Sequence, residues 1–432
     1  MKRSALLLAM VGLLVAAGQA GAVICTVDDV PAATLLLPYF EVDFANANGV
    51  TTLFSVNNAS ATAILAHVTV WSDLSYPVLD FNIYLTGYDV QSVNLRDVLN
   101  GVLPQTASLG QDPGDHISPK GPLSQDINFA SCSGLLPPPV QLPADFVAYL
   151  HAALTGQPSS GVTGCAASVC CAAQAFGDNI GRGYVTIDTV NNCTLRFPSD
   201  PGYFGAGGTG DATNQNVLWG DAFFVNSAEN FASGNPLVHI EADATNPQTS
   251  VPGQYTFYGR YVAWQATDNR EPLATDFAVR YLNGGAFNGG TVLHVWRDAK
   301  TTPEAFICAP GNGPSWYPLG QEGIVIFDEQ EHPQQTPGFP VSPQPRNPTL
   351  LPFPAEANST IVGGTSLPVP FAFGWLYLDL NTTIAGNPNP PEDPAADQNW
   401  VEVQMRAEGR YEVGFSAIKL DSACAAVHFF PH

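Results

Sequence analysis

The sequence is poor in positive charge. Only 15 of its 432 residues are Lys or Arg, against 38 Asp and Glu, which gives a formal net charge of -23. Because binding to phosphates needs a basic surface, this balance argues against nucleic acid as a partner. The acidity is typical of a soluble extracellular protein. It also leaves calcium binding open, since hard cations prefer carboxylate and carbonyl oxygens.

Long apolar segments are missing after the N-terminus. Lys2 and Arg3 precede an apolar run over 5–17, and the small residues of 20–22 follow it. This is the pattern of a secretory signal peptide, and its apolar core is shorter than the roughly 20 residues of a spanning helix. A lipid anchor on Cys25 is disfavoured because Ile24 is not the small residue that such processing needs. We therefore expect no transmembrane anchor, and a chain that is extracellular, periplasmic or at the cell surface.

Recognisable catalytic and cofactor motifs are missing too. No H-E-x-x-H, G-x-S-x-G or P-loop pattern occurs. The run 205–210 matches G-x-G-x-x-G, but it has no strand before it and no helix after it to meet a phosphate, so we interpret it as a loop. We assign no catalytic or cofactor-binding residue, and enzymatic activity is not predicted.

Three histidines share similar surroundings in expected strands. A metal site or a general base would need His67, His239 and His294 to converge, with a carboxylate such as Glu241 or Asp73 beside them. The simpler interpretation places each one separately on a sheet face, bonded to its neighbours.

Acidic clusters offer two further hypotheses. Glu41 with Asp43, and the acidic residues of 328–331, could supply the two carboxylates of a glycoside hydrolase if they met in space. The loops 111–115 and 392–397 carry oxygen ligands suited to calcium, although neither has EF-hand spacing. The alternative for all four segments is a solvated strand end or loop.

Disulfide bonds are expected from the cysteines. An even number of them behind a signal peptide is typical of a disulfide framework, and the pairing is left open. Because five of the eight lie between 132 and 193, complete pairing requires at least one bond from that segment to a distant cysteine. Zinc is disfavoured because the cluster lacks C-x-x-C spacing. The candidates are Cys25, Cys132, Cys165, Cys170, Cys171, Cys193, Cys308 and Cys424.

The clearest periodicity in the chain lies between 49 and 87. The segment 78–86 alternates apolar and polar side chains, as a half-buried strand does. The segment 63–71 is apolar at nearly every position and predicts a central strand covered on both faces. With 51–57, these segments predict three antiparallel strands. Further strands are expected over 88–95, 183–188, 217–225, 236–240, 254–266, 277–279, 291–298, 323–328, 371–380, 400–407 and 411–420.

Helices are expected mainly in one segment. Residues 143–155 have an apolar stripe, a proline in the first turn and Gly156 to end the helix. A second, alanine-rich helical piece is expected over 165–175, and one short turn over 94–101. The predicted division is 1–22 signal peptide, 23–130 N-terminal β region, 131–178 Cys-rich helical insertion, 179–332 central β region, 333–358 Pro-rich extended segment, and 359–432 C-terminal strands completing the β region.

Tryptophans and tyrosines are frequent enough to suggest sugar binding, since exposed aromatic faces stack on sugars. Most are expected to pack in the core, among them Trp71, Trp264, Trp296 and Trp375, which lie in apolar segments. Trp316, between two prolines, is the aromatic residue most open to exposure, although packing is favoured there as well.

Four runs carry a resemblance. The residues of 35–40, 85–90, 219–221 and 238–242 resemble those of large secreted bacterial proteins of unknown function. The resemblance implies a secreted β-rich chain and transfers no site residues.

The sequence thus predicts a mainly β fold, with antiparallel β-sandwich-like modules and a small disulfide-rich helical insertion. The expected function is non-catalytic: a binding, adhesive or envelope-structural protein with an extracellular glycan or protein ligand. The alternative is an extracellular hydrolase acting on a polysaccharide or other polymer. The sequence does not indicate an oligomeric state.

Overall fold

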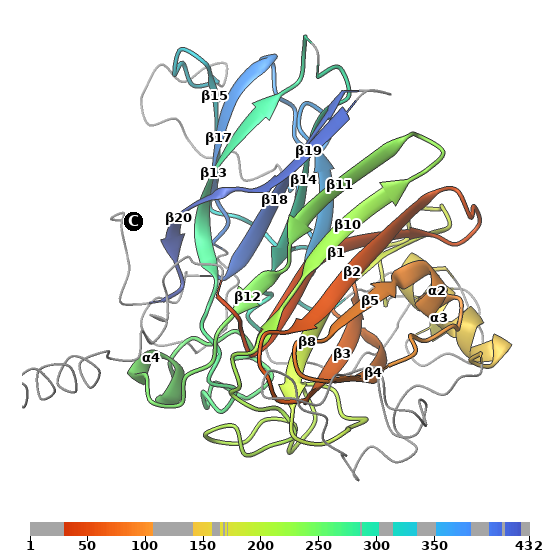
Figure 1. The fold of residues 1–432 in the computed structure, drawn as a ribbon. Coiled ribbons are helices and arrows are strands. Elements are labelled where there is room, and N and C mark those ends of the chain that lie inside the picture. Colours follow the sequence, from red (N-terminus) through yellow and green to blue (C-terminus); the bar gives the residue numbers. More distant parts are fainter. Residues whose placement is uncertain are drawn as a thin grey trace, which may run out of the picture.

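The computed structural model describes residues 30–106, 141–157, 165–166, 169–170, 172–285, 287–301, 314–334, 351–381, 397–407 and 411–424. The fold is mainly β, as predicted, and the paired strands of this part run antiparallel (Figure 1). Within these ranges no helix has the length and apolar character that crossing a membrane requires.

Sheet I lies in the middle of the N-terminal half. Its strand order is β12 (Val238–Ile240), β1 (Thr34–Asp43), β8 (Ile180–Val190), β3 (Ile64–Ser72) and β4 (Pro77–Leu85). Both faces of β1 are covered: Leu35 and Leu37 belong to one core cluster, and Leu36 belongs to another. β3 is buried at every position, which confirms the central strand expected from its unbroken apolar run.

Sheet II covers one face of sheet I. Its order is β11 (Phe231–Pro236), β10 (Asp221–Asn226), β2 (Val50–Asn58) and β5 (Val90–Asn94), with β9 (Leu218–Trp219) also paired to β2. Phe54 and Val56 of β2 point toward sheet I and join the same core cluster as Leu35. We expected β2 to pair beside β3 in one sheet, and that prediction was wrong. β2 pairs with β5, β9 and β10, whereas β3 pairs with β4, as expected, and with β8.

Sheet III is formed by the C-terminal half. Its order is β15 (Gly323–Asp328), β17 (Phe373–Asp379), β13 (Ala274–Leu282), β18 (Asn399–Ala407), β14 (Gly290–Arg297) and β16 (Ala357–Ile361). β19 (Tyr411–Ser416) pairs with β18, and β20 (Ile418–Ser422) with β13, so the expected single strand over 411–420 is split in two. Its core contains Phe277, Leu293 and Leu376.

The helices are few and short. α2 (Leu95–Leu99) and α3 (Ala144–Thr155) were predicted, and Gly156 ends α3 in the left-handed conformation at φ 64°. α4 (Pro247–Ser250) was not expected. The second helix expected over 165–175 is wrong, because β6 (Cys165–Ala166) and β7 (Val169–Cys170) form a small hairpin there. Alanine favours a helix by only tenths of a kcal/mol per residue, which strand pairing readily overrides.

Two other expectations are corrected. No strand forms over 254–266, where the chain makes successive turns and buries Tyr255, Phe257 and Tyr258 as a plug of aromatic side chains. A disulfide-rich helical insertion is not supported within the described ranges. Cys193 and Cys424 lie outside 131–178, and both are buried and disulfide-bonded; no described cysteine is free.

The second face of sheet I meets sheet III. An aromatic cluster that includes Trp71 and Tyr184 from sheet I and Trp296 from β14 fills this junction. Main-chain bonds cross it as well, since the amides of Glu356 and Ala357 both donate to the carbonyl oxygen of Asp73. The two halves therefore share one interior.

Candidate functional site

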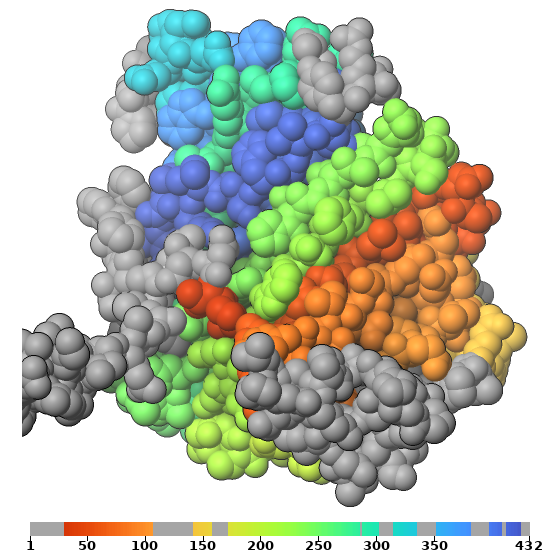
Figure 2. Space-filling view, viewed as in Figure 1, coloured from red at the N-terminus to blue at the C-terminus, as the bar shows by residue number. Residues whose placement is uncertain are grey.

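Exposed aromatic residues and two pockets coincide on the outer face of sheet II. Side chains alternate across a strand, so Phe54 and Ala222 point into the core while Leu53, Asp221 and Phe223 point outward. Figure 2 shows β10 and β11, in light green, crossing the molecule between the blue strands of sheet III and the red and orange of β2 and β5. We call this surface the outer face.

Phe223 is held in an unusual position by the strand beside it. Its partner in register is Gly234 of β11, and a Cβ there would lie 2.6 Å from Phe223 Cδ1. The ring therefore lies over the space that a side chain would fill, against the backbone of β11. Phe223 is nevertheless 45% exposed, and Trp219, four residues earlier, is 42% exposed.

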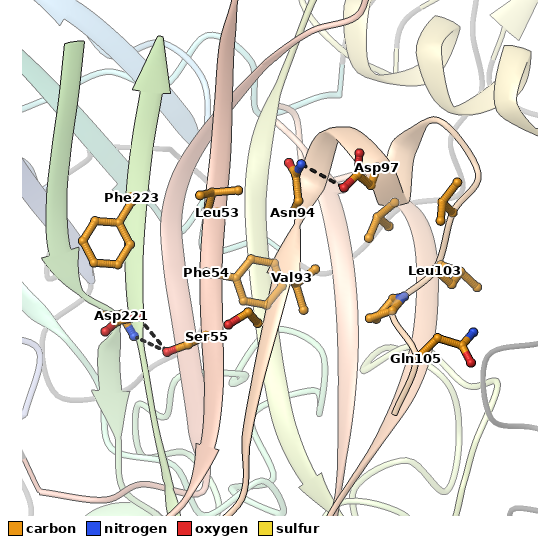
Figure 3. Close-up of a pocket in the computed structure, with 14 residues that line it drawn as sticks. Leu53, Phe54, Ser55, Val93, Asn94, Asp97, Leu103, Gln105, Asp221 and Phe223 are labelled. Atoms are coloured by element: carbon orange, nitrogen blue, oxygen red, sulfur yellow. Dashed lines mark hydrogen bonds between the residues drawn. The ribbon is translucent and has the colours of Figure 1, made fainter. Parts of the chain in front are cut away.

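Two pockets flank Asp221 and Phe223, and both residues line each of them. The first, the β5-side pocket, has a volume of about 580 Å³ and reaches across β2 and β5 to α2 and the segment 102–105. Figure 3 shows Phe223 and Asp221 at one end of it and Leu103 and Gln105 at the other. The second, the β11-side pocket, has a volume of about 530 Å³ and is lined by Pro31, Trp219, Gly220, Asp221, Phe223, Gly234, Asn235, Pro236 and His239.

The polar groups of the outer face are fixed by hydrogen bonds. Ser55 donates its hydroxyl to Asp221 Oδ1 at 2.7 Å, across the β2–β10 pair (Figure 3). Asn94 Nδ2 donates to Asp97 Oδ2 at 2.9 Å and so ties β5 to α2. Among the described residues that line the two pockets there are two aspartates and neither Lys nor Arg. The site is therefore electrically negative, with a single histidine at its edge.

This arrangement suits binding better than bond cleavage. Aromatic faces and fixed polar groups lie side by side, as in surfaces that stack on a ligand and accept its hydrogen bonds. The two carboxylates of the pockets are each engaged by a neutral neighbour, Ser55 or Asn94.

The three histidines do not converge. His67 lies in register with Asp188, which faces Thr34, which faces Ile240, so His239 points to the opposite face of sheet I. His67 Nδ1 is 3.0 Å from Asn82 Oδ1, and His239 Nδ1 is 2.8 Å from the carbonyl oxygen of Val30.

His294 belongs to sheet III and packs against the rings of Tyr39 and Phe224. Burial lowers the pKa of His294 to about 3, so it is neutral at ordinary pH. Because the three histidines lie apart, neither Glu241 nor Asp73 completes a site with all of them. No group of three potential metal ligands occurs among the residues that the structure describes.

The acidic pairs have local structural roles. Glu41 accepts a hydrogen bond from the hydroxyl of Tyr39, and Asp43 accepts the amides of Ala45 and Asn46 in a turn. Asp328 closes the turn after β15 by accepting the amides of Gln330 and His332. Of the two loops considered for calcium, 111–115 and all but Asp397 of 392–397 lie outside the described residues.

A cluster of charged side chains lies inside the molecule. Glu356 accepts hydrogen bonds from Arg260 Nη2 at 2.9 Å and from the Ala299 amide at 2.9 Å, and Arg260 Nε lies 3.4 Å from Asp298. All three side chains are almost fully buried. Burial raises the pKa of Glu356 to about 7 and that of Asp73 to about 7. This cluster joins the halves of the molecule and presents no surface to a ligand.

The burial of the aromatic residues agrees only in part with the expectation from the sequence. Trp71, Trp264 and Trp296 are core residues, Trp375 is half-buried and stacks on Phe327, and Trp316 is half-buried beside Tyr317. The sequence did not identify Trp219 as exposed, nor Phe223, although both lie in the predicted strand 217–225. Their spacing from Asp221, two residues on either side, was the available signal.

The loop 205–210 forms turns and no phosphate-binding strand–helix unit, as predicted. Comparisons with known proteins add no assignment to this geometry: no family model, no curated protein and no solved structure matches the chain.

Proposed function

We propose that this chain is a secreted or cell-surface protein that binds an extracellular polysaccharide through the outer face, without cleaving it. The observation that carries the proposal is the pair of exposed aromatic side chains, Trp219 and Phe223, on either side of Asp221 between two pockets. The N-terminal signal pattern supports export, and the neutral surroundings of both carboxylates support binding over hydrolysis.

Two structural expectations belong to the same proposal. Sheets I and II act as a sandwich-like module that holds the outer face rigid, since residues of both sheets share one core cluster. Disulfides from Cys193, which follows β8 of sheet I, and from Cys424, which follows β20 of sheet III, secure the strand ends outside the cell.

Affinity electrophoresis tests the function. The chain without residues 1–22 is run through native gels that contain soluble polysaccharides, and release of reducing ends is measured in parallel. We expect at least one polysaccharide to retard the protein and no new reducing ends to form. Trp219→Ala should weaken retention tenfold or more, because exposed tryptophans dominate such contacts.

Phe373→Ala is the matched control. Phe373 lies on β17 of sheet III, and its exposed fraction of 37% is similar to the 45% of Phe223, but it lines neither pocket. It should bind like the wild type. Equal loss in both variants, or no retention by any polysaccharide, would refute the proposal. Release of reducing ends would favour the hydrolase instead.

A further inference from the structure

We propose that the ligand of the outer face is a linear, uncharged polysaccharide that crosses the strands at Asp221 and places sugar units in both pockets. This inference rests on the proposed function and specifies its ligand. It depends on three properties of the site: the continuity of the pockets, their direction relative to the strands, and the charge of their lining.

The two pockets meet at the same residues. Asp221 and Phe223 line both, so these two side chains lie on the boundary between the β11-side pocket and the β5-side pocket. The Phe223 ring lies over Gly234, against the backbone of β11. A ligand longer than one pocket can therefore continue into the other.

The combined groove runs across the strands. Its lining passes from His239 on β12 through β11, β10, β2 and β5 to Gln105. The strands β11 to β5 alone span three strand spacings, about 14 Å. A peptide that binds as an added β-strand lies alongside an edge strand, in line with the other strands of the sheet. A groove that crosses the strands instead suits an extended chain that is recognised through its faces.

The aromatic residues fit such a crossing. Trp219 and Phe223 are two residues before and after Asp221, about 7 Å away along the strand on each side. A chain that crosses β10 at Asp221 passes between them and can stack on both. Asp221 would accept hydroxyl hydrogen bonds from the sugar at the crossing, and Gln105, which is exposed, would bond to the sugar at the far end through its amide.

The charge of the lining excludes acidic polymers. Asp97 and Asp221 both face the β5-side pocket, and within its described lining, as in that of the β11-side pocket, there is no Lys or Arg. A polymer carrying carboxylates or sulfates would be repelled and would find no cation to pair with. Neutral hydroxyls meet both carboxylates favourably.

Two polysaccharide panels test the inference on the chain without residues 1–22. One panel holds neutral polymers (a soluble β-glucan, a galactomannan and an arabinoxylan), and the other holds acidic ones (alginate and polygalacturonate). We expect retention by a neutral polymer only. Oligosaccharides of increasing length from that polymer should bind with rising affinity until both pockets are filled, by tenfold or more overall.

Variants locate the chain. Trp219→Ala should weaken the β11-side contacts and Gln105→Ala the β5-side contacts, so each should flatten the length dependence. Phe223→Ala should weaken both, and Phe373→Ala should change nothing. Gly234→Ala provides a second test: its Cβ would displace the Phe223 ring, so it should weaken binding without removing a ligand contact of its own.

The two hypotheses fail differently. Trp219-dependent retention by acidic polymers, or equal affinity for short and long oligosaccharides, would overturn the inference and leave the binding function standing. Absence of retention by both panels would overturn both. If Trp219→Ala instead converts a dimer into a monomer in sedimentation equilibrium while no polysaccharide binds, the outer face is an interface between two copies and the inference is wrong.

Discussion

Glu402 is a buried carboxylic acid with no cation beside it among the described residues, and its replacement should stabilise the protein at alkaline pH. It lies on β18, opposite His294 of β14 and Ser416 of β19, and the amide of Asn235 from β11 is its hydrogen-bond partner. His294 is neutral because burial lowers its pKa to about 3. Burial raises the pKa of Glu402 to about 7.

The magnitude follows from that pKa. An unfolded glutamate titrates near 4.3, so the difference is almost 3 units, and each unit corresponds to about 1.4 kcal/mol. Because the folded pKa is the higher one, the protonated acid contributes stability that is present in full below about pH 4 and is lost as pH rises through 7. At pH 8 the wild type therefore carries a cost of about 4 kcal/mol from this group.

Glu402→Gln removes the titration and keeps the shape and the bond to Asn235. Its free energy of unfolding should exceed that of the wild type by about 4 kcal/mol at pH 8 and by well under about 1 kcal/mol at pH 4. Urea denaturation followed by tryptophan fluorescence at both pH values measures the difference. Glu329→Gln, on a half-exposed side chain, is the control and should stay within about 0.5 kcal/mol at both.

A Glu402→Gln variant that is no more stable than the wild type at pH 8 would refute the reasoning. It would mean that a cation or water compensates the carboxylate in solution. A gain of the same size at both pH values would point to packing and would refute the electrostatic cause as well.

Two further stability predictions concern pairs of matched sites. Arg260→Met should destabilise the fold by about 3–5 kcal/mol at pH 8, because it leaves Glu356 and Asp298 buried without their cation. The control Arg280→Met, at an exposed pair with Glu329, should cost at most about 1 kcal/mol. Equal losses of the two variants in urea denaturation would contradict this prediction. Phe277→Ala should cost about 3–5 kcal/mol through the cavity it leaves in the core of sheet III. The control is Ile418→Ala, because Ile418 is 67% exposed on β20 and its loss should change the unfolding midpoint little. A midpoint for Phe277→Ala near that of the wild type would contradict the prediction and show that the core collapses around the gap.

Periodicity in the sequence located most strands but not their partners. The apolar run of β3 predicted burial on both faces because that property is local, and β3 is central. That β2 belongs to a different sheet could not be inferred, since β3 pairs with β8, more than 100 residues later. β11 was missed because Phe231–Pro236 contains Gly, Asn and Pro and little apolar alternation.

The candidate site shows the same limit. Trp219, Asp221 and Phe223 were inside a predicted strand, but which of its two faces is covered depends on sheet I lying behind Ala222 and Leu218. Ser55 meets Asp221 across a sequence separation of 166 residues. Exposure of the aromatic residues is therefore a property of the assembled sheets.

The order of strands in sheet I determines when β1 gains its two neighbouring strands during synthesis. β1 is completed on one side by β8 and on the other by β12, which ends about 200 residues after β1. At a synthesis rate of roughly 5–20 residues per second, the segment spends about 10–40 s without its last neighbour. The residues Thr34 to Leu36, which pair with β12, keep one unpaired backbone edge through that interval, so a chain interrupted before Ile240 ends with an exposed edge on β1.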